Sequence, residues 1–150
     1  MNLTVEAEGV EETLFAMRGV ERELRNPANA EIRAAAKETA GELAEDLRVA
    51  AGSSGVPVAA RVAQSIKVKS DRFPTVQIGG STRVGRGGAP AAALVWGSEH
   101  GPAGDPNHFA VAPNAGGYWI RPTVERFQES KAPDRFRRAV FEITRRFGLD

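Results

Sequence analysis

An apolar stripe with a helical period runs through residues 26–52 and constrains the fold more than any other feature. Its members recur at helical spacing: Ile32, Ala35, Ala36, Ala40, Leu43, Leu47 and Ala51. This spacing places them on one face of an α-helix. Asn26 before Pro27 is typical of a helix start, and Gly52 is suited to end the helix. Because most of the stripe is alanine, we expect close packing against neighbouring elements.

Other periodic segments predict a small sheet and further helices. Apolar and polar residues alternate, as in strands, over residues 2–8, 64–70 and 73–80. The last two strands form a predicted hairpin with a turn near residues 70–72. Helices are predicted over residues 10–24, over 58–64 and after Pro122, where residues 118–120 look extended.

The last predicted helix covers residues 134–148 and is strongly two-sided. Its apolar stripe consists of Phe136, Val140, Ile143 and Phe147. Arginines crowd the other face, and Arg145 and Arg146 fall in the last turn, where the helix dipole favours cations. Together the elements predict one α+β domain over residues 1–150, in which a small antiparallel sheet packs against two main amphipathic helices. Long Gly/Pro loops are expected over 79–90 and 101–117.

Composition excludes several classes of site. The 150 residues contain no cysteine, so disulfides, thiolate metal sites and cysteine nucleophiles are excluded. The net charge of +1 argues neither for a dedicated nucleic-acid binder nor for an acidic tail. The N-terminus lacks the pattern of a signal peptide, and no apolar run is long enough for a membrane span, so we expect a soluble chain made in the cytoplasm.

Charge is distributed unevenly along the chain. Residues 1–50 carry 11 acids and 6 bases, whereas residues 51–90 carry 6 bases and 1 acid. Such segments can complement each other between neighbouring copies. One hypothesis is that the acidic helices of one subunit face the basic hairpin of the next, and another is that residues 79–90 become ordered only on docking. The simpler interpretation is that the acids lie on exposed helix faces.

No constellation of catalytic residues stands out. His100, Asp105 and His108 resemble metal ligands, but their spacing matches no metal motif. Glu99 beside His100 could form a proton relay, although adjacent side chains point in different directions. The sequence has no nucleophile elbow around Ser98 and no phosphate-binding glycine loop. We therefore assign no catalytic, metal or cofactor residue and expect no enzymatic activity.

The middle of the chain is basic, which leaves a second function open. The cations are Arg61, Lys67, Lys69, Arg72, Arg83 and Arg86. Cations on a strand and a loop can contact phosphates, so a nucleic-acid-binding accessory protein that uses the hairpin at residues 61–86 is the alternative. Only Phe73 is available there for base stacking. The two tryptophans, Trp96 and Trp119, are expected to anchor a core or a subunit interface.

Three segments, taken in order, resemble a known family. The first is GVPVAARVAQSIKVKS at 55–70, a proline and short helix leading into a strand. The second is APAAALVWGSEHG at 89–101, a run of small residues that ends in an aromatic, glycine and serine. The third is GYWIRPTVERF at 117–127, an aromatic–x–Arg–Pro entry to a helix. This combination resembles the neck or tail-completion proteins of long-tailed bacteriophages, also called minor tail components.

The resemblance implies a structural virion protein that forms a ring at the head–tail junction. The ring would occupy a neck, head-closure, tail-completion or tail-terminator position, with a hexamer preferred and a dodecamer possible. Its partners would be further copies and the adjacent connector and tail proteins, while DNA passes through the lumen without sequence-specific binding. Candidate assembly contacts are Lys67, Lys69, Arg83, Arg86, Trp96, Glu99, His100, Trp119 and Arg121.

Overall fold

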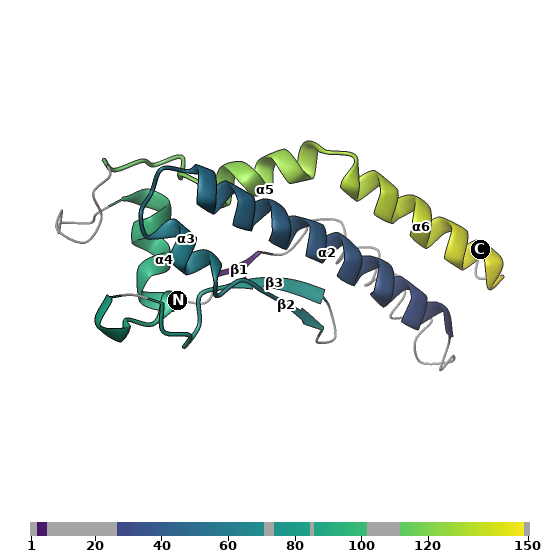
Figure 1. The fold of residues 1–150 in the computed structure, drawn as a ribbon. Helices are drawn as coiled ribbons and strands as arrows, with labels where there is room; N and C mark the ends of the chain where they lie inside the picture. The colour runs from purple at the N-terminus through teal and green to yellow at the C-terminus, as the bar shows by residue number, and fades with distance from the viewer. Residues whose placement is uncertain (1–2, 6–26, 71–73, 85, 102–111, 149–150) are drawn as a thin grey trace.

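The longest element, α2 (Pro27–Ser53), carries the predicted apolar stripe and forms the spine of the molecule (Figure 1). Every residue of the stripe is buried except Ala35, which is half-buried. The helix starts at the predicted proline but runs through Gly52, the predicted end, to Ser53. The chain turns away at Gly55, whose φ of 73° is a left-handed conformation that favours glycine.

The computed structural model describes residues 3–5, 27–70, 74–84, 86–101 and 112–148. The predicted helix over residues 10–24 lies outside these ranges, as do Arg72, Asp105 and His108. The side chain of Arg86 is likewise outside the description.

Three strands form an antiparallel sheet in the order β1-β3-β2. They are β1 (Leu3–Val5), β2 (Lys67–Ser70) and β3 (Pro74–Ile78). Val68 pairs with Val76 across β2 and β3, which confirms the predicted hairpin. Val76 and Ile78 are buried in the main core cluster together with the middle of α2.

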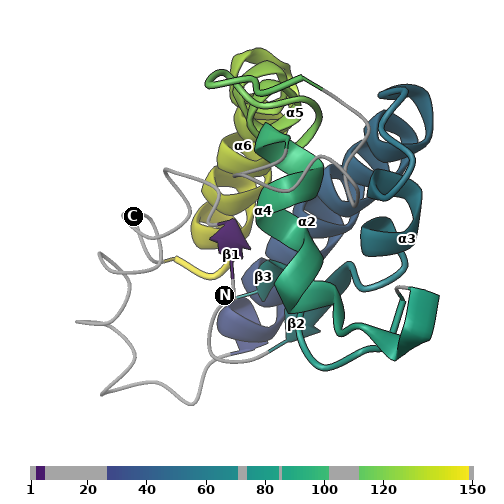
Figure 2. The same ribbon diagram turned by 90° about the vertical axis from the view of Figure 1, so that its left-hand side faces the viewer.

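Two short helices lie at one end of the molecule. The predicted short helix is present as α3 (Ala59–Ala63). The sequence pattern assigned no element to α4 (Ala91–His100). Alanine and leucine at the start of this segment favour a helix, whereas Pro90 before it and Gly101 after it confine the helix to ten residues. Figure 2, viewed from this end, shows α4 crossing in front of α2.

The chain finishes with α5 (Ile120–Glu129) and α6 (Ala132–Arg146), which confirms both predicted C-terminal helices. Ile120, expected to be extended, is already the first helical residue. Helix α6 runs antiparallel beside α2 (Figure 1). The two helices share a second core cluster formed by Ala28, Ile32, Ala36, Phe136, Val140 and Ile143.

Helix α2 lies between the sheet and the α5–α6 pair, so the fold is α+β as predicted (Figure 1). The segment at 79–90 differs from the expected open loop. A bridge joins Arg83 to Pro90, the turn η1 (Arg86–Gly88) lies inside it, and the N–H of Val84 donates to the carbonyl of Ala89 at 3.0 Å. These contacts join the two sides of the segment within one chain, and the effect of docking on it stays a prediction.

Candidate functional site

The most densely hydrogen-bonded polar site in the described chain joins the end of α4 to the start of α5. Glu99, in the last turn of α4, is only 3% exposed. Its Oε2 accepts the backbone N–H groups of Trp119 at 3.1 Å and Ile120 at 2.7 Å. Its Oε1 accepts the N–H of Arg121 at 2.8 Å. Glu99 therefore caps a helix that lies 20 residues further along the chain.

The physical reason for this cap is the start of α5 itself. The first N–H groups of an α-helix have no partner within the helix, and they carry the positive end of its dipole. No side chain from the start of α5 provides a cap, because Trp119 occupies the N-cap position. A carboxylate from α4 satisfies three donors at once and brings a negative charge to the positive helix end.

Trp119 and Ser98 extend the same junction into the core. Trp119 is fully buried, and its Nε1 donates to Ser98 Oγ at 3.3 Å. The Ser98 hydroxyl in turn donates to the carbonyl of Val95 at 2.7 Å. Each polar atom of this buried pair thus has a partner, as burial requires. Consecutive residues of α4, Ser98 and Glu99, both hold the segment that begins at Trp119.

The chain that returns to α5 is also fixed to the end of α4. The N–H of Asn114 donates to the carbonyl of His100 at 2.9 Å, and His100 Nδ1 lies 3.0 Å from the carbonyl oxygen of Asn114. The N–H of Tyr118 donates to the carbonyl of Glu99 at 2.8 Å. These bonds hold both ends of the connection between α4 and α5.

The two tryptophans differ in their surroundings. The prediction that a tryptophan anchors the core is confirmed for Trp119. It is wrong for Trp96, because Trp96 is 52% exposed. Its ring lies against the ring of His100, with centroids 4.3 Å apart. Spacing explains the difference: on α4, Val95, Ser98 and Glu99 share an inward face, and Trp96 lies about 100° around the helix from Val95, outside that face.

Glu99 is a candidate assembly contact from the sequence, which disfavours a relay with His100, and the structure gives its carboxylate a different role. Both carboxylate oxygens bind backbone N–H groups inside the protomer. The His100 ring bonds to Asn114 rather than to Glu99. The prediction that Trp119 is an assembly contact is also wrong, because its side chain is fully buried within one chain.

The basic candidates do not form a single site. Lys67 and Lys69 are exposed on β2, an edge strand of the described sheet. The Arg83 guanidinium donates to the carbonyl of Gly88 at 2.8 Å, within its own loop. Arg121 lies on α5, where it forms an exposed ion pair with Glu125 at 2.9 Å. Among the basic candidates whose side chains the structure describes, Lys67 and Lys69 alone share one exposed element.

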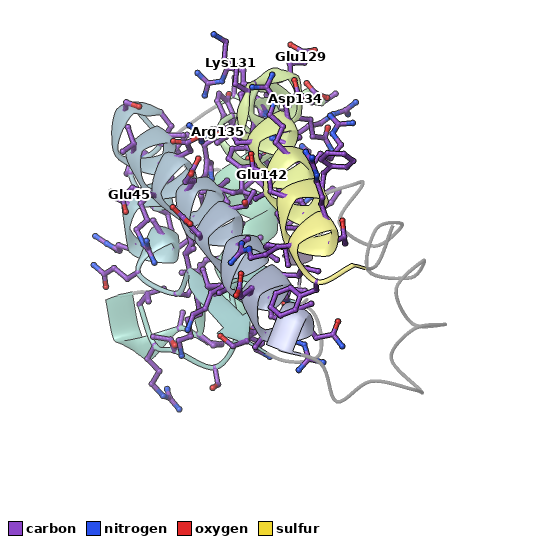
Figure 3. All side chains as sticks on the ribbon, turned by 90° about the vertical axis from the view of Figure 1, so that its right-hand side faces the viewer. Glu45, Glu129, Lys131, Asp134, Arg135 and Glu142 are labelled. Atoms are coloured by element: carbon purple, nitrogen blue, oxygen red, sulfur yellow. The ribbon has the colours of Figure 1, made fainter. Side chains whose placement is uncertain are left out.

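A surface that the sequence interpretation missed runs over α2 and α6. Arg146 forms an ion pair with Glu31 at 3.0 Å, and Arg135 pairs with Glu42. Figure 3 shows Arg135 between the two helices, with Glu45 on the flank of α2 that faces away from α6. Two acids of α2 are thus neutralised by α6 within the same chain, and contact with the basic hairpin of a neighbouring copy stays a prediction. The opposite charges of these two amphipathic helices are the sequence feature that could have predicted their ion pairs.

Two further features bear on chemistry. An open groove of about 280 Å³ lies between α2 and α5, with Val49, Ala50 and Phe127 as its apolar lining and Asp46 and Arg126 as its charged lining. Among the residues that the structure describes, no group of three or more His, Asp or Glu side chains could hold a metal ion. Within the same ranges, no helix combines the length and apolar character needed to cross a membrane.

Comparisons of the chain with protein-family models, with curated proteins and with solved structures found no match.

Proposed function

We propose that this chain is a structural virion protein of a long-tailed bacteriophage that forms a ring at the head–tail junction. The observation that carries the proposal is that the three segments resembling the neck and tail-completion family meet in one unit. The first provides α3 and β2, the second α4, and the third the start of α5. Ser98 and Glu99 of the second segment bind Trp119, Ile120 and Arg121 of the third.

The residues of this unit serve architecture. Its buried carboxylate is occupied by three backbone N–H groups, and its buried hydroxyl bonds to an indole and a carbonyl. Meanwhile large apolar side chains stand on the surface, namely Val49, Trp96 and Phe141. They lie on α2, α4 and α6, and each is available as an apolar anchor for a contact with another protein. This combination favours a subunit of an assembly over an enzyme.

One observation favours the second candidate, a nucleic-acid-binding accessory protein. Lys67 and Lys69 project from the same face of an exposed edge strand, where they can contact phosphates. A dedicated binder of this kind should shift a duplex DNA probe, with an affinity that falls steeply as salt rises. A junction protein should shift the probe weakly at most. If the shift is strong at physiological salt and lost in Lys67→Glu/Lys69→Glu, the second candidate replaces the first.

The direct test is deletion of the coding sequence from a phage that carries it, followed by electron microscopy of the lysate. Full heads beside separate finished tails indicate a joining role, and overlong tail tubes indicate a terminator role. An epitope-tagged copy should restore infectivity and be labelled at the junction. Normal particles after deletion, or labelling elsewhere on the virion, would rule out the proposal.

A further inference from the structure

The outer face of α2 is acidic and ends in an exposed apolar side chain. Glu38, Glu42, Glu45 and Val49 follow one another at spacings of four, three and four residues, so they lie on one side of the helix. This side is opposite to the buried stripe. Val49 is 63% exposed. Glu45 forms an exposed pair with Arg48 at 3.2 Å, a contact that contributes little stability and is readily exchanged.

The outer face of α6 has the opposite charge around a second exposed apolar side chain. Arg138, Phe141 and Arg145 are spaced by three and four residues and lie opposite the buried stripe of α6. Phe141 is also 63% exposed. Within the described part of the chain, neither Arg138 nor Arg145 forms an ion pair. The two helices thus present faces of similar shape and complementary charge.

The two faces cannot meet within one chain. The ion pairs Glu42–Arg135 and Glu31–Arg146 fix the antiparallel alignment of α2 and α6. This alignment places Phe141 level with Ala36, which is 13 positions before Val49 in the sequence. At 1.5 Å per helical residue, Val49 and Phe141 are separated by about 20 Å along the helix axis.

We infer that the acidic face of α2 docks onto the arginine–phenylalanine face of α6 in a second copy of this chain. Val49 of one copy packs against Phe141 of the other, and Glu45, one turn from Val49, lies beside the arginines that flank Phe141. Because the two faces differ, the contact is heterologous and repeats from copy to copy. This inference rests on the proposed function for its closed ring; the pairing of charges and exposed apolar side chains comes from the helices themselves.

The absence of native cysteine allows a direct cross-linking test. Full-length Val49→Cys, carrying a tag, is mixed with untagged Phe141→Cys at high protein concentration under mild oxidation. The expected product is a disulfide-linked pair of one tagged and one untagged chain. The matched control replaces Val49→Cys by Gln64→Cys, an exposed position at the end of α3, and should give no such pair.

The double variant Val49→Cys/Phe141→Cys gives the order of the assembly. It should form a ladder of cross-linked chains whose largest member contains as many chains as the ring has subunits. Charge reversal in Glu45→Lys should weaken self-association of the native chain about threefold, equivalent to one modest surface ion pair. Adding Arg138→Glu/Arg145→Glu to the same chain should restore association.

Three results would overturn the inference. The first is that no disulfide forms between the tagged and untagged chains, although both thiols react with a soluble thiol reagent. Another is a linked pair between two Val49→Cys chains, and the third is a double variant that stops at a doubly linked dimer. Electron microscopy tests the proposed function separately. If the protein forms the cross-linked ladder but is absent from virions, the contact stands and the proposed function is rejected. If the protein lies at the junction but forms no ladder, the proposed function stands and this contact is rejected.

Discussion

Gly117 leaves the space that the Glu99 carboxylate occupies. A Cβ atom at residue 117 would lie 1.9 Å from Glu99 Oε1, and the φ of this glycine is 83°. Two independent requirements, a left-handed backbone and the absence of a side chain, therefore coincide where the helix cap forms.

We expect Gly117→Ala to lower the free energy of unfolding by about 2–4 kcal/mol, from backbone strain and loss of the Glu99 cap. Denaturant unfolding monitored by circular dichroism measures this. Gly116→Ala is the matched control, because its Cβ would meet only Asn114 Oδ1 at 3.5 Å, and it should change stability by less than about 0.5 kcal/mol. Equal effects at the two positions would contradict the packing described here.

Glu99→Ala should lower the free energy of unfolding by about 3 kcal/mol, because it leaves three backbone donors, two of them buried, without their acceptor. Glu99→Gln should cost less, since an amide oxygen still accepts but the charge at the helix end is lost. The same denaturant experiment compares both with Glu125→Gln, whose exposed pair with Arg121 contributes below about 1 kcal/mol. If the Glu99→Ala protein is as stable as the Glu125→Gln control, Glu99 does not cap α5.

The two tryptophans should separate cleanly in fluorescence. Trp96→Phe leaves only buried Trp119, so its emission should shift to shorter wavelength and resist quenching by acrylamide. Trp119→Phe leaves exposed Trp96, which should be quenched readily. The second variant should also lose about 2 kcal/mol of stability, because it leaves a cavity and removes the partner of Ser98. The prediction fails if both single-tryptophan proteins are quenched equally.

Alanines on the buried face of α2 should resist enlargement. Ala44→Leu should destabilise the protein by about 1–3 kcal/mol, because Ala44 is buried in the main core cluster. Ala34→Leu, on the exposed face of the same helix, should be nearly neutral. Thermal unfolding measures both variants. A similar loss in the two would mean that α2 does not need alanine for close packing.

Strong periodicity made much of the fold predictable. The stripes of α2 and α6 and the alternation of β2 and β3 each reflect burial of one face, so spacing alone identified them. Helix α4 was missed because glycine and proline surround ten residues that have too little amphipathic contrast to stand out. Local composition resembled a loop, although the segment itself is helical.

The site was less predictable because its contacts are remote in sequence. Nothing near Glu99 in the chain indicates that its acceptors face Trp119, Ile120 and Arg121, and its neighbour His100 suggested a relay instead. Likewise, segment charges indicated complementarity, but not that α6 provides the cations for α2. Pairings of this kind depend on how the elements are arranged in space, which spacing along the chain does not report.

The hydrogen bonds that join the end of α4 to the start of α5 have an evolutionary consequence. His100 and Asn114 bond to each other, and Gly101 lies so close to Ala112 that a Cβ there would meet its carbonyl oxygen at 2.7 Å. The ends of the connection are therefore set by the residues that flank it. A relative that keeps Glu99 as the cap of α5 must therefore also keep glycine at positions 101 and 117, so these three residues should be inherited together.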